Sequence, residues 1–299
     1  MNAATKTKKV KKPASLGSKV FDVVNYSILA IVGFIMLYPM WYVLVVSISS
    51  SKFISLGEVA FIPKGITFEA YERVFDSKNI WTGYKNTIVY TVVGTIINVG
   101  LSAMCAYPLS RKEFYGRRIL TILITITMFV SGGLIPLYLV VNHLHLMNTM
   151  WAVILPSAIS TYNMIIMRTS FEAIPDALVE SAYLDGANDL VIFRYIIIPL
   201  SKAITATMVL FYSVSHWNSY FPAMLYLNSK AKYPVQVIMR DIIIGSDMSE
   251  AGDTSALSMV SMTNYRYAVI IISLIPILLV YPFIQKYFTK GVMVGAVKG

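Results

Sequence analysis

The chain of 299 residues is 57% hydrophobic and only 13% charged, whereas about a quarter of the residues in a soluble domain carry a charge. Runs of about twenty apolar residues recur along it, which excludes an ordinary soluble domain and indicates a protein that lies in a bilayer. The net charge of +10 would suit nucleic acid, but the placement of the basic residues favours membrane topology, so we expect no nucleic-acid partner. Cys105 is the only cysteine, so no disulfide forms within the chain.

Six apolar segments predict six transmembrane helices and hence an all-α membrane protein. In chain order they cover residues 24–48, 87–109, 119–141, 150–167, 203–225 and 267–286. Residues 1–20 form a basic tail that runs into the first span without a small-residue cleavage site, which predicts a signal anchor rather than a removable signal peptide. We expect residues 21–299 to form one transmembrane domain.

The basic residues indicate how the spans are oriented. Lysines crowd the N-terminal tail, four basic residues lie between Arg111 and Arg118, and the connection 142–149 carries none. Because cytoplasmic loops are enriched in Lys and Arg, both termini are expected in the cytoplasm of a bacterium, with the protein in its inner membrane. The C-terminal tail 287–299 is then cytoplasmic.

Two long segments, 50–86 and 228–266, fall outside the membrane in this orientation. The first is mixed in charge, and the second contains a stretch rich in Gly, Ser and Asp from Gly245 to Ser255. Such a stretch is either a linker or a loop that contacts a partner.

The connection between the fourth and fifth spans is too polar to cross a bilayer and predicts two short helices in an L. Pro175 suits the first turn of a helix, where its missing N–H costs nothing. Gly186 accepts the left-handed conformation that ends a helix. Asn188 or Asp189 can cap a second helix, which Pro199 is expected to close.

This connection, residues 171–199, resembles the EAA loop of ABC-importer permeases. The matching residues are Glu180, Ala182, Asp185, Gly186, Ala187, Phe193, Ile196 and Pro199. Ser181 departs from the usual alanine, a small-for-small change expected to fit the same surface. The resemblance implies a type I importer permease fold in which this loop docks in a cleft of a partner ATPase and couples it to the transport pathway.

Motifs for other chemistry are weak or missing from the sequence. No G-x-x-x-x-G-K-S/T motif occurs, so this chain is not itself the ATPase. His143 and His145 lack a nearby Cys or carboxylate, which favours a solvated loop over a metal site. No nucleophile stands out, so we expect no enzyme, no catalytic or metal-binding residue and no cofactor bound by this chain; the resemblance assigns ATP and Mg to the partner ATPase.

The fifth span contains the most polar aromatic cluster of any span. Its members are Tyr212, Ser215, His216, Trp217, Asn218 and Tyr220. Polar groups inside a membrane usually face a bundle interior or a water-filled cavity, and aromatic faces beside hydroxyl and amide groups suit a sugar. The cluster therefore lines a substrate pathway or joins helices through hydrogen bonds.

Further runs resemble permeases of carbohydrate ABC importers over nearly the whole chain. Trp217-Asn218 matches their fifth span, and the end of the chain resembles the tail of the smaller maltose-transporter permease, apart from Ala296. That resemblance implies ATPase contacts for three tail residues, Gly291, Gly295 and Lys298. The runs 131–136 and 291–299 resemble the subgroup that imports polysaccharide fragments, including pectin- and alginate-derived oligosaccharides.

The resemblance implies a heterotetramer in which a second related permease and two ATPase subunits join this chain, with an extracytoplasmic solute-binding protein as a further partner. The substrate that the resemblance implies is an acidic oligosaccharide. Two other classes stay open from the residues alone. A secondary carrier or channel would need no docking helix, and a membrane-embedded enzyme would need a nucleophile or metal cluster in its spans.

Overall fold

The computed structural model describes residues 16–244 and 263–279, in which helices are joined by loops and no strand occurs. The helices in the first half of the chain are α1 (Leu16–Ser47), α2 (Ser51–Ser55), α3 (Glu69–Asp76), α4 (Lys78–Ser110), α5 (Arg117–Ile126), α6 (Leu134–His143) and α7 (Met150–Ile154). Those that follow are η1 (Leu155–Ser157), α8 (Thr161–Glu172), α9 (Asp176–Leu184), α10 (Asp189–Ile192), η2 (Phe193–Ile197), α11 (Ile198–Leu200), α12 (Lys202–Trp217), α13 (Phe221–Tyr226), η3 (Lys230–Lys232), α14 (Val235–Ile244) and an unlabelled helix, Thr263–Leu279.

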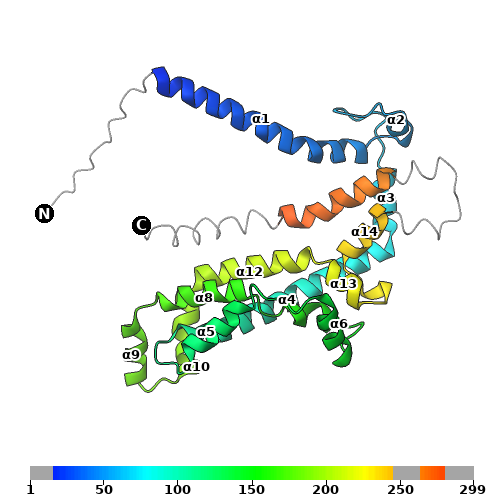
Figure 1. The fold of residues 1–299 in the computed structure, drawn as a ribbon. Helices are drawn as coiled ribbons and strands as arrows, with labels where there is room; N and C mark the ends of the chain where they lie inside the picture. The colour runs from blue at the N-terminus through cyan, green and yellow to red at the C-terminus, as the bar shows by residue number, and fades with distance from the viewer. Residues whose placement is uncertain (1–15, 245–262, 280–299) are drawn as a thin grey trace.

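Helix α4 is the centre of the molecule, and α8 and α12 pack along it (Figure 1). The main apolar core joins these three helices and continues into α9, α10 and η2 through Val179, Ala182, Ile192 and Ile197. The predicted polar connection is therefore anchored to the membrane bundle by buried side chains. A second cluster packs α3, α14 and the helix Thr263–Leu279 around the N-terminal end of α4.

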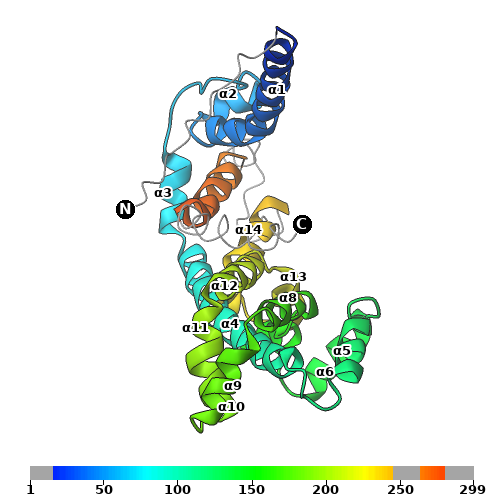
Figure 2. The same ribbon diagram turned by 90° about the vertical axis from the view of Figure 1, so that its left-hand side faces the viewer.

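Helix α1 projects away from this bundle, as Figures 1 and 2 show from two sides. In its most apolar window only 6% of the residues are buried. Val45, Val46 and Ser47, in the last turn, are the buried exceptions, and Tyr42 meets the ring of Tyr267 edge-on at 6.1 Å. The rest of α1 is left for lipid or another subunit to cover.

The length and composition of α1 and α4 confirm the first two predicted spans. Both are long and apolar enough to cross a membrane, and α4 begins at Lys78, nine residues before the predicted boundary. Counting each sharply bent helix pair as one span raises the number to four within the described residues. The helix Thr263–Leu279 covers part of the predicted sixth span, whose residues 280–286 lie outside the described part of the chain.

Three predicted spans differ from continuous helices. The span 119–141 is divided into α5, which ends at Ile126, and α6, which begins directly after Gly133 with its φ of +85°. The span 150–167 bends by 53° between η1, which contains Pro156, and α8. In the span 203–225, α12 ends at Trp217 and α13 starts with Pro222 in its first turn. Hydropathy detects the apolar runs, but glycine and proline decide where the helices break.

Candidate functional site

The loop between α8 and α12 has the two-helix geometry predicted for it. Helix α9 ends where Gly186 turns the chain with a φ of +83°. The Ala187 N–H donates to the Ala182 carbonyl at 2.9 Å and the Gly186 N–H to the Tyr183 carbonyl at 3.0 Å, the paired bonds of a Schellman motif. The Asn188 side chain then caps α10 by accepting from the Val191 N–H at 3.0 Å.

The second arm of the loop continues slightly further than predicted. Pro199 was expected to close the helix, but α11 extends through it to Leu200. The five residues before α11 form a π-helix, in which the Ile198 N–H donates to the Phe193 carbonyl. The wider π turn accommodates a residue without an N–H, and the chain then bends by 83° at Ser201 into α12.

The two faces of α9 differ in character. Val179 and Ala182 are buried against the core of the chain itself. Glu180 and Ser181 are exposed, and Glu180 has no ion pair or hydrogen bond among the described residues. The small side chain of Ala182 therefore allows close packing within this chain, whereas Glu180 and Ser181 are the part that a partner can reach.

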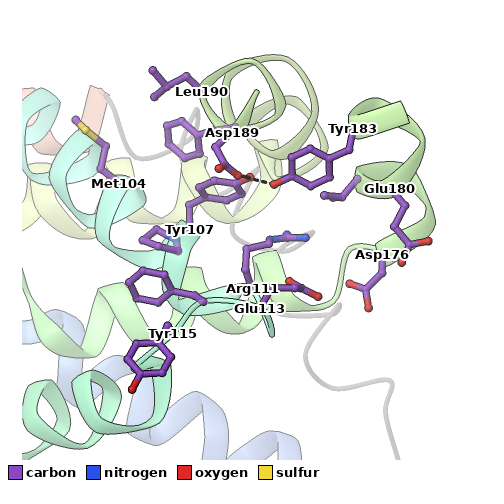
Figure 3. A pocket seen from close by; sticks show the side chains of 14 residues that line it. Met104, Tyr107, Arg111, Glu113, Tyr115, Asp176, Glu180, Tyr183, Asp189 and Leu190 are labelled. Carbon is purple, nitrogen blue, oxygen red and sulfur yellow. Dashed lines mark hydrogen bonds between the residues drawn. The ribbon is translucent and has the colours of Figure 1, made fainter. Parts of the chain in front are cut away.

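An aromatic and acidic cluster joins the loop to the end of α4 (Figure 3). Asp189 accepts hydrogen bonds from the Tyr183 hydroxyl at 2.6 Å and from the Tyr107 hydroxyl at 3.1 Å. The ring of Phe193 lies 5.2 Å from that of Tyr107. The hydrogen bond to Asp189 raises the pKa of Tyr183 above its ordinary value, because the carboxylate accepts the proton of the neutral hydroxyl.

Ion pairs connect the same loop to the connection between α4 and α5. Lys112 Nζ lies 2.9 Å from Asp176 Oδ2, and their contact raises the pKa of Lys112 and lowers that of Asp176. Glu172 pairs with Arg117 and, at 3.4 Å, with Arg168. In the sequence, Lys112 and Arg117 indicated only the orientation of the spans. Their opposite charge to the acidic loop was the available signal that the two segments meet.

Between these segments lies a groove of about 880 Å³. It is lined by Met104, Tyr107, Pro108, Arg111, Glu113, Phe114, Tyr115, Asp176, Val179, Glu180, Tyr183, Asp189, Leu190 and Phe193. Four carboxylates line the groove against one guanidinium, that of Arg111, which lies 5.3 Å from the centre of the Tyr107 ring. An acidic groove with aromatic walls can accept a cationic side chain from another protein.

The polar cluster of the fifth span is divided between two sides of α12. Tyr212 and His216 are buried towards α4, whereas Ser215, Asn218 and Tyr220 are exposed and Trp217 is half-buried against the second core cluster. Asn218 bonds within its own helix, to the Val214 carbonyl at 3.0 Å. The predicted six residues therefore do not form one surface.

The buried members of this cluster, Tyr212 and His216, take part in hydrogen bonds that join α12, α4 and the bend between η1 and α8. The Tyr212 hydroxyl lies 2.6 Å from Ser102 Oγ on α4 and accepts from the Ser160 N–H at 3.1 Å. Asn98 Nδ2 lies 3.1 Å from His216 Nε2 and donates to the Ser157 carbonyl at 3.1 Å. The side chains of α4 and α12 thus satisfy two backbone groups at the bend between η1 and α8.

The remaining residues singled out in the sequence either lie outside the described part of the chain or are exposed without forming a site. Gly291, Gly295, Lys298 and the stretch 245–255 lie outside the described residues. His143 and His145 are exposed, and residues 16–244 and 263–279 contain no group of three His, Cys, Asp or Glu side chains placed to hold a metal ion.

Comparison with known proteins identifies the family. The profile of the family described as "Binding-protein-dependent transport system inner membrane component" matches residues 80–294. The chain belongs to this family. It is thus a transport permease of an ABC importer in the inner membrane, and the α4–α8–α12 bundle with its loop lies within the matched residues.

Two relatives and one solved structure resemble this permease over nearly its whole length. The polygalacturonan/rhamnogalacturonan transport system permease protein YtcP of Bacillus subtilis (strain 168) is 42% identical, with 94% of this chain and 99% of YtcP covered. Protein LplC of the same organism is 40% identical, with 94% and 96% covered. A bacterial ABC transporter involved in the import of the acidic polysaccharide alginate contains a chain with 37% identity and a TM-score of 0.86, with 93% and 100% covered.

Proposed function

We propose that this permease imports acidic oligosaccharides such as fragments of pectin or alginate. The supporting observation is that its near-full-length relatives are named for polygalacturonan and rhamnogalacturonan transport and for alginate import. Both substrate classes are uronic-acid polymers, so negative charge is the property that they share. The exposed Ser215, Asn218 and Tyr220 supply hydroxyl and amide groups suited to sugar hydroxyls.

We further propose six spans with both termini in the cytoplasm. The loop 171–199 contacts the basic connection around Arg111 and Lys112, so the two segments belong on the same side of the membrane. That connection is the most basic short loop of the chain, which favours the cytoplasm. A second permease would pack against the uncovered side of the α4–α8–α12 bundle, and a solute-binding protein would approach from the opposite side.

In the same proposal, Glu180 and the acidic groove form the surface to which the two ATPase subunits of the complex dock. Those subunits bind ATP and Mg, and this chain binds neither. Glu180 is exposed and unpaired among the described residues, and the groove beside it is rich in carboxylates. Losing the cationic partner of a desolvated carboxylate typically costs about 2–5 kcal/mol. Glu180→Lys should therefore release the ATPase from a permease that is still inserted.

The docking role is tested by co-purifying the ATPase with variants of the assembled complex. Gly186→Val strains a left-handed residue by about 1–2 kcal/mol and should misplace α10, although no atom lies within 4 Å of a Cβ built at Gly186. Gly57→Val is the matched control, because Gly57 also has a positive φ of 69° and open space around it but lies far from the loop along the chain. Wild-type ATPase recovery and uptake with Glu180→Lys and Gly186→Val would refute the docking role.

The substrate is tested in proteoliposomes that contain the complete complex and its binding protein. Oligogalacturonate or oligoalginate should stimulate ATP hydrolysis and accumulate inside, whereas a neutral glucan of equal length should do neither. Equal or greater uptake of the neutral sugar would overturn the acidic-substrate proposal and leave the family assignment intact.

A further inference from the structure

The segment after α1 turns back along that helix. The Ser50 N–H donates to the Lys64 carbonyl and the Thr67 N–H to the Ile48 carbonyl, each at 3.0 Å. These two bonds close residues 50–67 into a compact unit. Gly65 makes its turn with a φ of +62°, and a Cβ there would lie 2.9 Å from the Phe53 ring. The conformation is therefore tightly packed, and we call residues 56–68 the return loop.

The return loop runs back alongside α1 and does not project beyond the C-terminal end of that helix. Trp41 Nε1 donates to the Phe61 carbonyl at 2.8 Å, and the Tyr38 and Phe61 rings lie 5.1 Å apart. Trp41 precedes the last residue of α1, Ser47, by six positions, which is roughly 9 Å along a helix that rises 1.5 Å per residue. Phe61 is thus held alongside the helix at the depth of Trp41.

That depth corresponds to a membrane interface. No charged residue occurs between Asp22 and Lys52, so the uncharged part of the helix spans more than the hydrocarbon core of about 30 Å. Tyr38 and Trp41 near its end are residue types that gather at the headgroup level. Trp41 is itself 50% exposed, and the flanking surface of α1 is apolar.

The outward side of the return loop continues this apolar surface. Leu56, Phe61, Ile62 and Ile66 are 60%, 57%, 73% and 65% exposed, respectively. The opposite side packs inward through Val59, which is 6% exposed beside Val45 and Val46. The loop contains only two charged residues, and they neutralise each other, since Lys64 Nζ lies 2.9 Å from a Glu58 carboxylate oxygen.

We propose that the return loop inserts into the bilayer at the boundary between headgroups and acyl chains and fixes the C-terminal end of α1 at that depth. A lipid surface is favoured over a protein because the exposed side chains continue the apolar surface of α1. Phe61 also lies beside α1 at the depth of Trp41, about 9 Å before the helix end, where a soluble partner approaching from water does not reach. This inference rests on the membrane placement of α1 and is independent of the transported sugar.

The test is spin-label accessibility in the complete transporter in liposomes. With Cys105 replaced by Ala, a nitroxide is attached at Ile62→Cys, and a second variant, Ile66→Cys, guards against local disruption. Glu72→Cys on α3 is the matched reference, because Glu72 is exposed and belongs to the polar face of an amphipathic helix.

At positions 62 and 66, oxygen collisions should exceed those of a water-soluble nickel chelate several-fold, and the order should reverse at position 72. Efficient collision with the nickel chelate at both loop positions would overturn the proposal, because the loop would then lie in water. Protection from both reagents with an immobilised label would also overturn it, since another protein subunit would then cover the loop.

Discussion

A single methyl group at Gly94 probes the contact between α4 and α12. A Cβ built at Gly94 would lie 2.5 Å from Nε2 of His216, closer than real side chains approach. His216 is only 7% exposed, and Asn98 bonds to the same ring nitrogen at 3.1 Å. The imidazole is therefore held in place, and Gly94→Ala forces the helices apart or breaks the hydrogen bond.

The size of the effect follows from two opposing contributions. Overpacking a well-packed core costs about 1–3 kcal/mol, whereas replacing Gly by Ala in a helix gains roughly 1 kcal/mol. Gly100 lies on the same helix, and no atom lies within 4 Å of a Cβ built there. Gly100→Ala therefore gains the helix propensity of alanine without a cost for overpacking. The difference between the two variants should thus be about 1–3 kcal/mol, or roughly 2–12 °C in melting temperature.

The assay is thermal unfolding of the purified complex in detergent. Gly94→Ala should melt below Gly100→Ala, and in a His216→Ala background the penalty of Gly94→Ala should largely disappear, because the methyl group then has space. Equal melting temperatures for the two glycine variants would refute the close contact. A penalty that persists without the imidazole would show that His216 is not its cause.

Three further predictions concern other parts of the chain. In a background without the native cysteine, Tyr115→Cys should react with an impermeant thiol reagent only from the cytoplasm and Leu144→Cys only from outside; the reverse would overturn the orientation. Asn218→Ala should reduce uptake while basal ATP hydrolysis and complex recovery persist, and unchanged uptake would remove Asn218 from the pathway. Tyr183→Phe deletes an exposed hydrogen bond to Asp189 that contributes about 1 kcal/mol, so the rate of amide hydrogen exchange in the loop should rise about fivefold. An unchanged rate would show that this bond does not stabilise the loop.

Local sequence signals predicted the loop accurately. Gly186 and Asn188 determine their own backbone geometry within a few residues, so the helix stop and the cap are both readable from the chain. Pro199 was misleading because its expected effect assumes an ordinary α-helix. The π turn that precedes it removes the conflict, and this turn depends on how η2 packs into the core.

Apart from the opposite charges of the loop and the connection 111–118, nothing in the sequence indicated which distant segments are in contact. Nothing near Tyr107 indicates that it meets Asp189, 82 residues later. Likewise, the polar cluster of the fifth span looked like one surface, yet helical geometry turns Tyr212 and His216 towards α4 and leaves Asn218 on the other side. Sequence spacing gives the face of a helix, but only the packing of neighbours decides which face is covered.

The bend at Ser157–Ser160 restricts how this transporter can move. In hydrocarbon, a backbone carbonyl or amide that loses its partner costs several kcal/mol. Here those partners are Asn98 on α4 and Tyr212 on α12. Sliding α8 against either helix would leave one of these backbone groups without its partner, so the two hydrogen bonds favour movement of the three helices as one unit. The 83° bend at Ser201 places the loop 171–199 at one end of these three helices, so under the proposed docking role a movement of the loop would be passed to all three.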